Sequence, residues 1–277
     1  MKENLIYDVG FNNGDDTAYY LHRGFNVLAI EANPGLVARG KQRFESEIAA
    51  GRLTVLNVAI AETEGMFSFW VNDDDDGWSS FDKALASRQG TRCHEVTVPG
   101  MPLSAILREH GVPYYLKVDI EGHDALCIRA LDRNNLPKYV SCELNHSEDI
   151  VRDLYQAGYR LFKLLNQTTY TGSIPIFEGE IAWRLLRKAY SRFSPVRYII
   201  HHLPLSLQPK KIPFDDFTSR LNYTFREGYS SGPFGEDTYG PWYSYEAMNK
   251  GVEQIRRKYL KAGLSLEDIW CDVHATR

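Results

Sequence analysis

Apolar runs of strand length alternate with helical segments through residues 5–165 of this 277-residue chain. The expected strands occupy residues 5–9, 26–31, 53–60, 115–120, 139–144 and 159–165. Helical segments separate most of these strands, and a hairpin is expected where residues 66–71 pair with residues 96–98. Such alternation is typical of an α/β protein with a doubly wound, Rossmann-like, mostly parallel sheet.

Four of the expected strands carry an acid at or near the carboxyl end: Asp8, Glu31, Asp119 and Glu143. In open α/β sheets, ligands bind outside the carboxyl ends of the strands. Buried carboxylates are costly unless they are paired or hydrogen-bonded. We therefore interpret the four acids as one polar site, with capping of the next helix as the alternative, above all for Glu143.

The turn after the first strand contains two glycines, in the pattern Asp8-x-Gly10-x-x-x-Gly14. The first glycine allows a tight turn, and the second allows the backbone to approach a ligand. Glu31 follows Gly14 by 17 residues and closes the second apolar run. An acid there is suited to a ribose diol, so the pattern predicts a nucleotide site. An ordinary strand–turn–helix remains the simpler alternative.

The helix after this turn begins with Asp15 and Asp16. Acids suit the helix dipole at this end, but they would repel a pyrophosphate. The third glycine of the dinucleotide fingerprint is also missing. A ligand with adenine, ribose and a cationic group fits better, which indicates S-adenosylmethionine (SAM). A nicotinamide-dependent oxidoreductase is the less favoured alternative.

The chain resembles the FkbM family of SAM-dependent methyltransferases. The matching segments are DVGFNNGDDT (8–17), EANP (31–34), NVAIAETEG (57–65), KVDIEGHD (117–124) and CEL (142–144). The resemblance implies a class I methyltransferase fold and O-methylation of a hydroxyl on a sugar, a glycan or a related metabolite. The acceptor preference rests on the resemblance alone, because a fold does not determine its substrate.

The resemblance and the positions of the motifs together assign a cofactor site. Asp8, Gly10, Asn12 and Gly14 are expected along the methionine arm, and Glu31 at the ribose. The remaining expected contacts are with the adenine, from Asn57 and Ala59, and with the methionine carboxylate, from Ser79 and Ser80.

Methyl transfer to an alcohol requires removal of the hydroxyl proton. Asp119, Glu121 and His123 are the candidate catalytic residues, and the choice between them stays open. No spacing demands a metal. The acidic run at residues 72–77 lacks the glutamate of an EF-hand loop, because Lys83 stands in that place.

Two departures from the family pattern support a further alternative, a non-catalytic binding subunit with the methyltransferase fold. Phe11 replaces the usual small residue after Gly10 and is expected to crowd the methionine arm. No helix precedes the first strand, so a usual cover of the cleft is expected to be missing.

The hydrophobic periodicity of the sequence weakens after residue 170, and Pro, Gly and aromatic residues become more frequent. We expect a SAM-binding core at residues 1–170 and a C-terminal aromatic and basic extension at 171–277. The extension is expected to complete the acceptor site and also the sheet, with residues 221–226 as the candidate strand. A basic amphipathic helix is expected at about 181–203. The basic segment 184–211 suggests contact with an anionic membrane or an acidic acceptor, such as a phosphorylated glycan; a helix packed on the core is the alternative.

Net charge, cysteine spacing and the length of apolar runs limit the classes of protein to which this chain can belong. The net charge of −4 gives no indication of nucleic-acid binding. The four cysteines are scattered without paired spacing, which suits a reduced compartment. We expect no secretory leader before the first strand and find no apolar run of membrane-spanning length. These features predict a cytoplasmic protein whose partner is a small-molecule or glycan acceptor.

Overall fold

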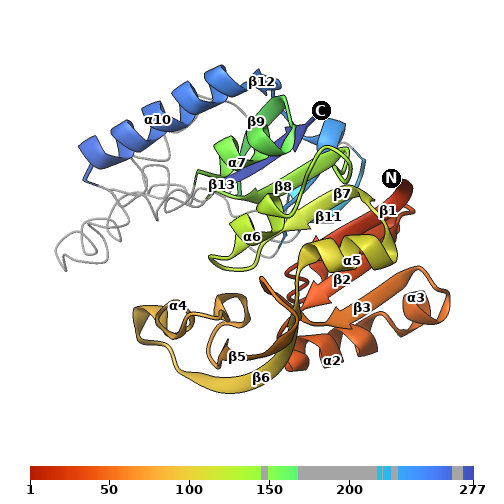
Figure 1. Ribbon diagram of the computed structural model, residues 1–277. Coiled ribbons are helices and arrows are strands. Elements are labelled where there is room, and N and C mark those ends of the chain that lie inside the picture. The colour runs from red at the N-terminus through yellow and green to blue at the C-terminus, as the bar shows by residue number, and fades with distance from the viewer. Residues whose placement is uncertain (145–148, 168–216, 220, 226–229, 264–270) are drawn as a thin grey trace, which may run out of the picture.

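The computed structural model describes residues 1–144, 149–167, 217–219, 221–225, 230–263 and 271–277. Within these ranges, strands of the main sheet follow the order β12-β9-β13-β8-β7-β1-β2-β3 (Figure 1). The strands are β1 (Lys2–Val9), β2 (Asn26–Glu31), β3 (Leu53–Asn57), β7 (Pro113–Val118), β8 (Tyr139–Glu143), β9 (Leu161–Asn166), β12 (Tyr243–Ser244) and β13 (Cys271–Thr276). From β3 to β8 neighbouring strands are parallel, while β13 is antiparallel to β8 and β9. The expected mixed α/β fold with a mostly parallel sheet is confirmed.

Helices cover both faces of this sheet because successive strand residues point to opposite sides. In β1, Tyr7 and Val9 pack in one cluster with residues of α5, α6, α7 and α10. Ile6 lies in a second cluster with Tyr19 and Tyr20 of α1. The helices are α1 (Asp15–His22), α2 (Pro34–Arg43), α3 (Glu45–Ala49), α4 (Lys83–Ala86), α5 (Leu103–His110), α6 (Asp124–Arg129), α7 (Ile150–Ala157) and α10 (Tyr245–Lys261).

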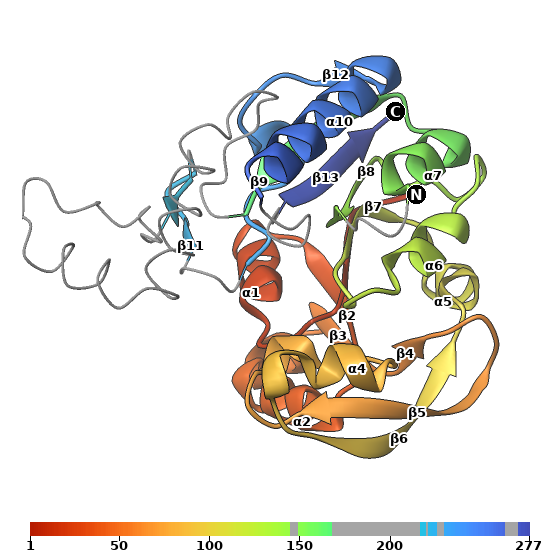
Figure 2. The same ribbon diagram turned by 90° about the vertical axis from the view of Figure 1, so that its left-hand side faces the viewer.

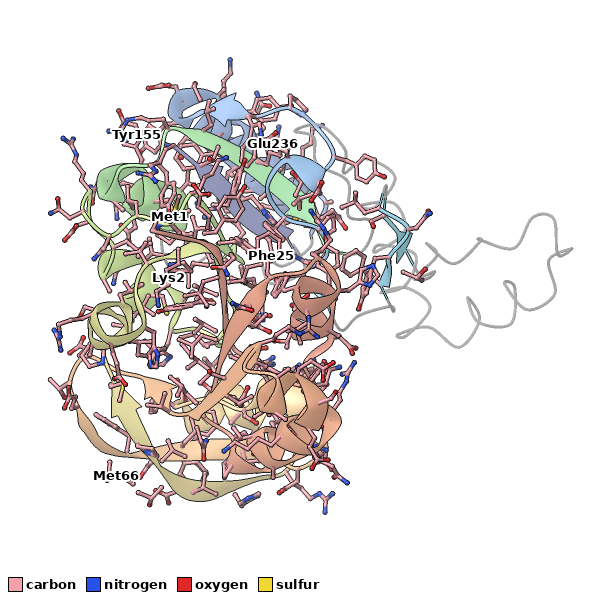
Figure 3. The ribbon with its side chains drawn as sticks, turned by 90° about the vertical axis from the view of Figure 1, so that its right-hand side faces the viewer. Met1, Lys2, Phe25, Met66, Tyr155 and Glu236 are labelled. Carbon is pink, nitrogen blue, oxygen red and sulfur yellow. The ribbon has the colours of Figure 1, made fainter. Side chains whose placement is uncertain are left out.

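A smaller sheet has the order β4-β6-β5 and consists of β4 (Ala59–Ile60), β5 (Gly65–Asn72) and β6 (Cys93–Met101). The predicted hairpin is confirmed, since β5 and β6 are antiparallel and run side by side (Figure 2). The single strand expected at 53–60 is wrong, because the chain leaves the main sheet after Asn57 and pairs with β6 through Ala59 and Ile60. Met66, 65% exposed, lies on this small sheet, far from Met1 (Figure 3).

The strand that completes the main sheet is β13, and not residues 221–226. Within that range, β11 (Thr224–Phe225) pairs with β10 (Phe217–Thr218) in a separate two-stranded sheet. β13 is buried along its whole length between β8 and β9. Its sequence, CDVHAT, alternates apolar with polar residues, a pattern that normally indicates a half-exposed strand.

The basic helix expected at about 181–203 and the basic segment 184–211 lie outside the described residues. The division at residue 170 therefore stays a prediction. In the ranges that the structure describes, no helix combines the length and apolar character needed to cross a membrane.

Candidate active site

A cavity of about 1070 Å³ opens at the carboxyl ends of β1, β2, β7 and β8. The residues that line the cavity come from the carboxyl ends of these strands and from the small sheet. Eight of the twelve residues predicted from the sequence line it: Gly10, Asn12, Glu31, Ala59, Ser79, Asp119, Glu121 and His123. The fold thus brings together residues spread over more than a hundred positions of the chain.

Asp8 and Gly14 lie behind the cavity wall. The Asp8 side chain is fully buried, and its Oδ2 accepts a hydrogen bond of 2.6 Å from Thr17 Oγ1. Gly14 precedes α1 as its N-cap residue with a φ of 83°, in the left-handed region. Both residues shape the turn between β1 and α1 without lining the cavity.

Asn57 and Ser80 also lie outside the cavity lining, yet each holds a residue that lines it. Asn57 Nδ2 donates to the backbone carbonyl of Glu31 at 2.9 Å. Ser80 Oγ donates to the carbonyl of Glu121 at 3.2 Å. These two hydrogen bonds help to position Glu31 and Glu121.

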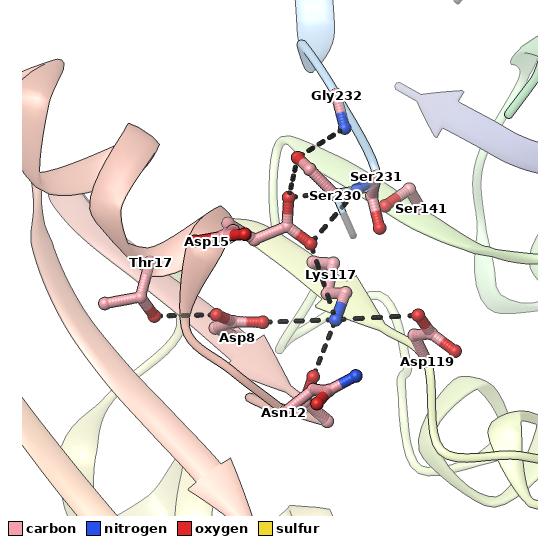
Figure 4. A network of polar contacts seen from close by, with 12 residues as sticks. Asp8, Asn12, Asp15, Thr17, Lys117, Asp119, Ser141, Ser230, Ser231 and Gly232 are labelled. Carbon is pink, nitrogen blue, oxygen red and sulfur yellow. Dashed lines mark hydrogen bonds and ion pairs between the residues drawn. The ribbon is translucent and has the colours of Figure 1, made fainter. Parts of the chain in front are cut away.

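Lys117 lies at the centre of a polar network beneath the cavity (Figure 4). Its Nζ donates to the Gly10 carbonyl at 2.7 Å and lies 3.3 Å from Asp8, 3.6 Å from Asp16 and 3.8 Å from Asp119. Burial opposes the charge of the ammonium, but the carboxylates, first that of Asp8, outweigh it and raise the pKa of Lys117. Lys117 was not predicted as a site residue, although a charged residue inside the apolar run YYLKV indicates a buried ion pair.

Asp16 joins the turn to the C-terminal part of the chain. Its carboxylate accepts hydrogen bonds from Ser230 Oγ and from the Ser231 backbone N–H, the latter at 2.9 Å. Burial raises the pKa of Asp16 to about 6, although Lys117 acts in the opposite direction. From the sequence, Asp16 was expected to suit the helix dipole and to repel a pyrophosphate, and neither serine was predicted as a site residue.

Glu31 is held rigidly at the end of β2. Its Oε2 accepts a hydrogen bond from the Asn12 backbone N–H at 2.9 Å, and its Oε1 accepts one from the Asn33 N–H at 2.8 Å. Asn12 adopts a φ of 49°, in the left-handed region, where its N–H donates to the carboxylate. Burial raises the pKa of Glu31, and the two backbone hydrogen bonds oppose that effect.

The candidate catalytic residues Asp119, Glu121 and His123 follow β7. Glu121 pairs with Arg88 at 2.9 Å and has a φ of 51°, which is uncommon for a residue with a side chain. Burial and then the charge of Asp119 raise the pKa of Glu121 to about 7. His123 packs against the Phe81 ring, and its Nδ1 has no hydrogen-bond partner in the described part of the chain.

A model of the methyltransferase FkbM domain matches residues 8–161, more than half of the chain. The protein belongs to the FkbM methyltransferase family. No match was found among the curated proteins.

The cavity of this FkbM methyltransferase extends beyond the matched domain. Glu143, at the end of β8, lies within residues 8–161, whereas Gln167 and Asp272 lie outside them. Asp272 faces Glu143 across the β8–β13 ladder. Burial and then Asp119 raise the pKa of Glu143 to about 8 and raise the pKa of Asp272. Neither Gln167 nor Asp272 was predicted from the sequence.

Phe11 does not crowd the cavity of the FkbM methyltransferase as the sequence suggested. The residue forms part of the wall, but it is only 2% exposed and its ring packs edge-on against Phe44. A β-carbon on Gly14 would lie 2.6 Å from the ring, and one on Gly40 would lie 2.3 Å from it. Two glycines therefore make room for the ring inside the core.

In the acidic loop of the FkbM methyltransferase, residues 72–77, positions 73–77 line part of the cavity. Asn72 Oδ1 accepts hydrogen bonds from the backbone of Asp74 and Asp75. Asp74 also pairs with Arg92 at 2.6 Å. Among the described residues, no group of three or more His, Cys, Asp and Glu side chains is arranged to hold a metal ion.

Proposed function

We propose that this FkbM methyltransferase transfers a methyl group from SAM to a hydroxyl oxygen of a sugar or a related metabolite. The observation that carries the proposal is a single cavity that joins the anchored carboxylate of Glu31 to the acids that follow β7 and to Glu143 at the end of β8. Glu31 is suited to binding the nucleoside, and the acids near β7 and β8 are suited to activating an acceptor in the same cavity.

The residues present fit SAM. Hydrogen bonds from Asn12 and Asn33 orient both oxygens of Glu31, and a carboxylate has further lone pairs for a ribose diol. Ala59 and its apolar neighbours Val58 and Ile60 line the same end of the cavity and suit an adenine.

The methionine end of SAM carries positive charges, on the ammonium and the sulfonium. Asp16 and Asp119 line the cavity beside Gly10, where the methionine arm is predicted. We assign the arm to Gly10, Asn12 and the turn shaped by Gly14. The methionine carboxylate is assigned to Ser79, which lines the cavity, whereas Ser80 positions Glu121 through its hydrogen bond to the Glu121 carbonyl.

When bound, SAM supplies a methyl group activated on a sulfonium sulfur. The residues of the chain must hold the acceptor oxygen in line with that methyl group and remove its proton. Among the candidates for the base, the geometry favours His123. Its Nδ1 has no partner among the described residues, whereas Glu121 is paired with Arg88 and Asp119 approaches Lys117.

Calorimetric titration with S-adenosylhomocysteine and, separately, with NAD tests the cofactor. We expect S-adenosylhomocysteine to bind and NAD not to bind. Glu31→Gln should weaken that binding by roughly 10- to 100-fold, because hydrogen bonds to a charged group are lost. The exposed Glu62→Gln should leave it unchanged. Binding of NAD alone would indicate an oxidoreductase, and binding of neither compound would indicate a non-catalytic subunit.

A further inference from the structure

The segment between β5 and β6, residues 73–92, contacts the turn that follows β7 in the main sheet. Its first contacts are with Glu121. Arg88 Nη1 lies 2.9 Å from Glu121 Oε2, and Ser80 Oγ donates to the Glu121 carbonyl at 3.2 Å. The segment therefore binds both the side chain and the backbone of this turn residue.

The next two residues of the turn also have partners in the segment. A β-carbon on Gly122 would lie 3.0 Å from Leu85 Cδ1, so Leu85 packs directly against the Gly122 backbone. The His123 ring packs against the Phe81 ring, with 5.2 Å between the ring centroids. Residues 73–92 thus contact the turn at three successive positions.

The backbone of the turn has an uncommon conformation. Glu121 has a φ of 51° and Gly122 a φ of 93°, so two successive residues lie in the left-handed region. A residue with a side chain rarely adopts that conformation and keeps it only where the surrounding contacts hold it. The hydrogen bond across the turn, from the Ile120 N–H to Asp124 Oδ1, is long at 3.3 Å. Contacts from residues 73–92 are therefore needed to hold the turn.

Arg88 makes two of its contacts with residues that line the cavity, although it lies outside the lining itself. Its guanidinium hydrogen-bonds the Glu121 carboxyl and lies over the Trp78 ring, 4.5 Å from the ring centroid. A planar guanidinium can stack on a ring and pair with a carboxylate at the same time. The Trp78 ring therefore helps to orient the group that holds Glu121.

We propose that Arg88 is a positioning residue for methyl transfer: through Glu121 it holds the turn at residues 121–123 in the conformation that presents His123 to the cavity. Arg88 acts on the reaction without touching the reacting molecules. The inference rests on the proposed function, in which His123 removes the proton of the acceptor.

The test observes the His123 ring in the full-length protein and needs no acceptor. Histidine labelled with carbon-13 gives ring signals in NMR spectra, and the signal absent from His123→Gln identifies His123. In the folded wild type this signal should differ from its position in urea, because the Phe81 ring lies beside it. Arg88→Met should move the signal at least halfway to the unfolded position or broaden it beyond detection. An unchanged His123 signal overturns the inference.

Two further variants separate positioning from a general loss of structure. Arg88→Lys keeps the charge but not the planar fork, so it should recover part of the wild-type position of the signal. Arg92→Met is the matched control, because Arg92 belongs to the same segment and pairs with Asp74 at 2.6 Å. It should leave the His123 signal unchanged. An equal change in Arg92→Met, or movement of all histidine signals in Arg88→Met, would show general loosening and overturn the inference.

Calorimetric titration with S-adenosylhomocysteine completes the test. Arg88→Met should bind this compound within about twofold of the wild type, because Arg88 lies outside the cavity lining. A loss of affinity of about tenfold or more would place Arg88 at the cofactor and overturn the inference. Absence of binding in the wild type would reject the proposed function, which is a separate result from an unchanged His123 signal.

Discussion

The carbonyl oxygen of Asp119 lies 1.8 Å from the point where a β-carbon on Gly10 would be placed. The two residues follow the adjacent strands β1 and β7, and the Asp119 N–H donates to the Val9 carbonyl at 2.9 Å. Only a residue without a side chain allows this approach, which brings Lys117 within reach of the Gly10 carbonyl. The close packing of two strand ends therefore builds the cavity floor.

Gly10→Ala should destabilise the protein strongly, because the new methyl group meets backbone atoms that cannot rotate away. Gly24→Ala is the matched control, since both glycines have a φ of 85° and a β-carbon on Gly24 would meet no atom within 4 Å. Conformational strain alone should cost roughly 1–2 kcal/mol at either position. Urea denaturation should show a clearly larger loss for Gly10→Ala, and equal losses would contradict the steric argument.

Lys117→Met should cost about 3–5 kcal/mol of folding free energy, because it leaves buried carboxylates without their cation. Asp8 is fully buried and Asp16 nearly so. The double variant Asp8→Asn/Lys117→Met should recover part of the loss in denaturant unfolding. Arg257→Met, which breaks an exposed pair with Glu253, should cost less than about 1 kcal/mol. Equal costs for the buried and the exposed pair would show that the network adds little.

Between about pH 4 and about pH 8 the raised carboxyl pKa values should lower the stability of the protein as the pH rises, against the opposite effect of His274, whose pKa burial lowers to about 3. The pKa of Glu143 is raised to about 8, whereas an unfolded glutamate has a pKa of about 4.3. Between these values the folded state keeps a proton that the unfolded state has released, so each pH unit costs at most ~1.4 kcal/mol for this group. Asp124 and Glu121, with pKa values raised to about 7, act in the same direction.

Glu143→Gln should flatten this dependence, because an amide does not titrate. The measurement is the free energy of unfolding of wild type, Glu143→Gln and Glu62→Gln at about pH 6 and about pH 8, the range in which Glu143 loses its proton. Glu62→Gln should keep the wild-type slope. A slope for Glu143→Gln as steep as that of the wild type would mean that Glu143 does not hold the proton.

Phe11→Ala should cost about 3–5 kcal/mol of stability, because it removes a buried ring from the core. Phe11→Leu, which keeps most of the volume, should cost less than about 1.5 kcal/mol. Neither variant should strengthen the binding of S-adenosylhomocysteine, because the ring packs against Phe44 and not in the cavity. Tighter binding after truncation would show instead that the ring obstructs the cofactor.

The sequence by itself determined the local elements and the first half of the site. The apolar run of residues 26–31 became β2 with the expected bounds, and Asn33 caps α2 through hydrogen bonds to its backbone, as an Asn-Pro pair predicts. The positions of Glu31 and Gly10 after their strands could be predicted because strand ends and turns depend on neighbouring residues.

Only the tertiary structure decided the other half of the site. Ser231 reaches Asp16 across 215 positions of the chain, and Asp272 pairs with Glu143 through a fully buried strand, although its alternating sequence is of the kind that normally indicates a half-exposed one. Burial of Lys117 among carboxylates likewise depends on the pairing of β1 with β7. Periodicity and turn chemistry report local conformation, whereas the partners of a buried charge come from whichever distant segments fold against it.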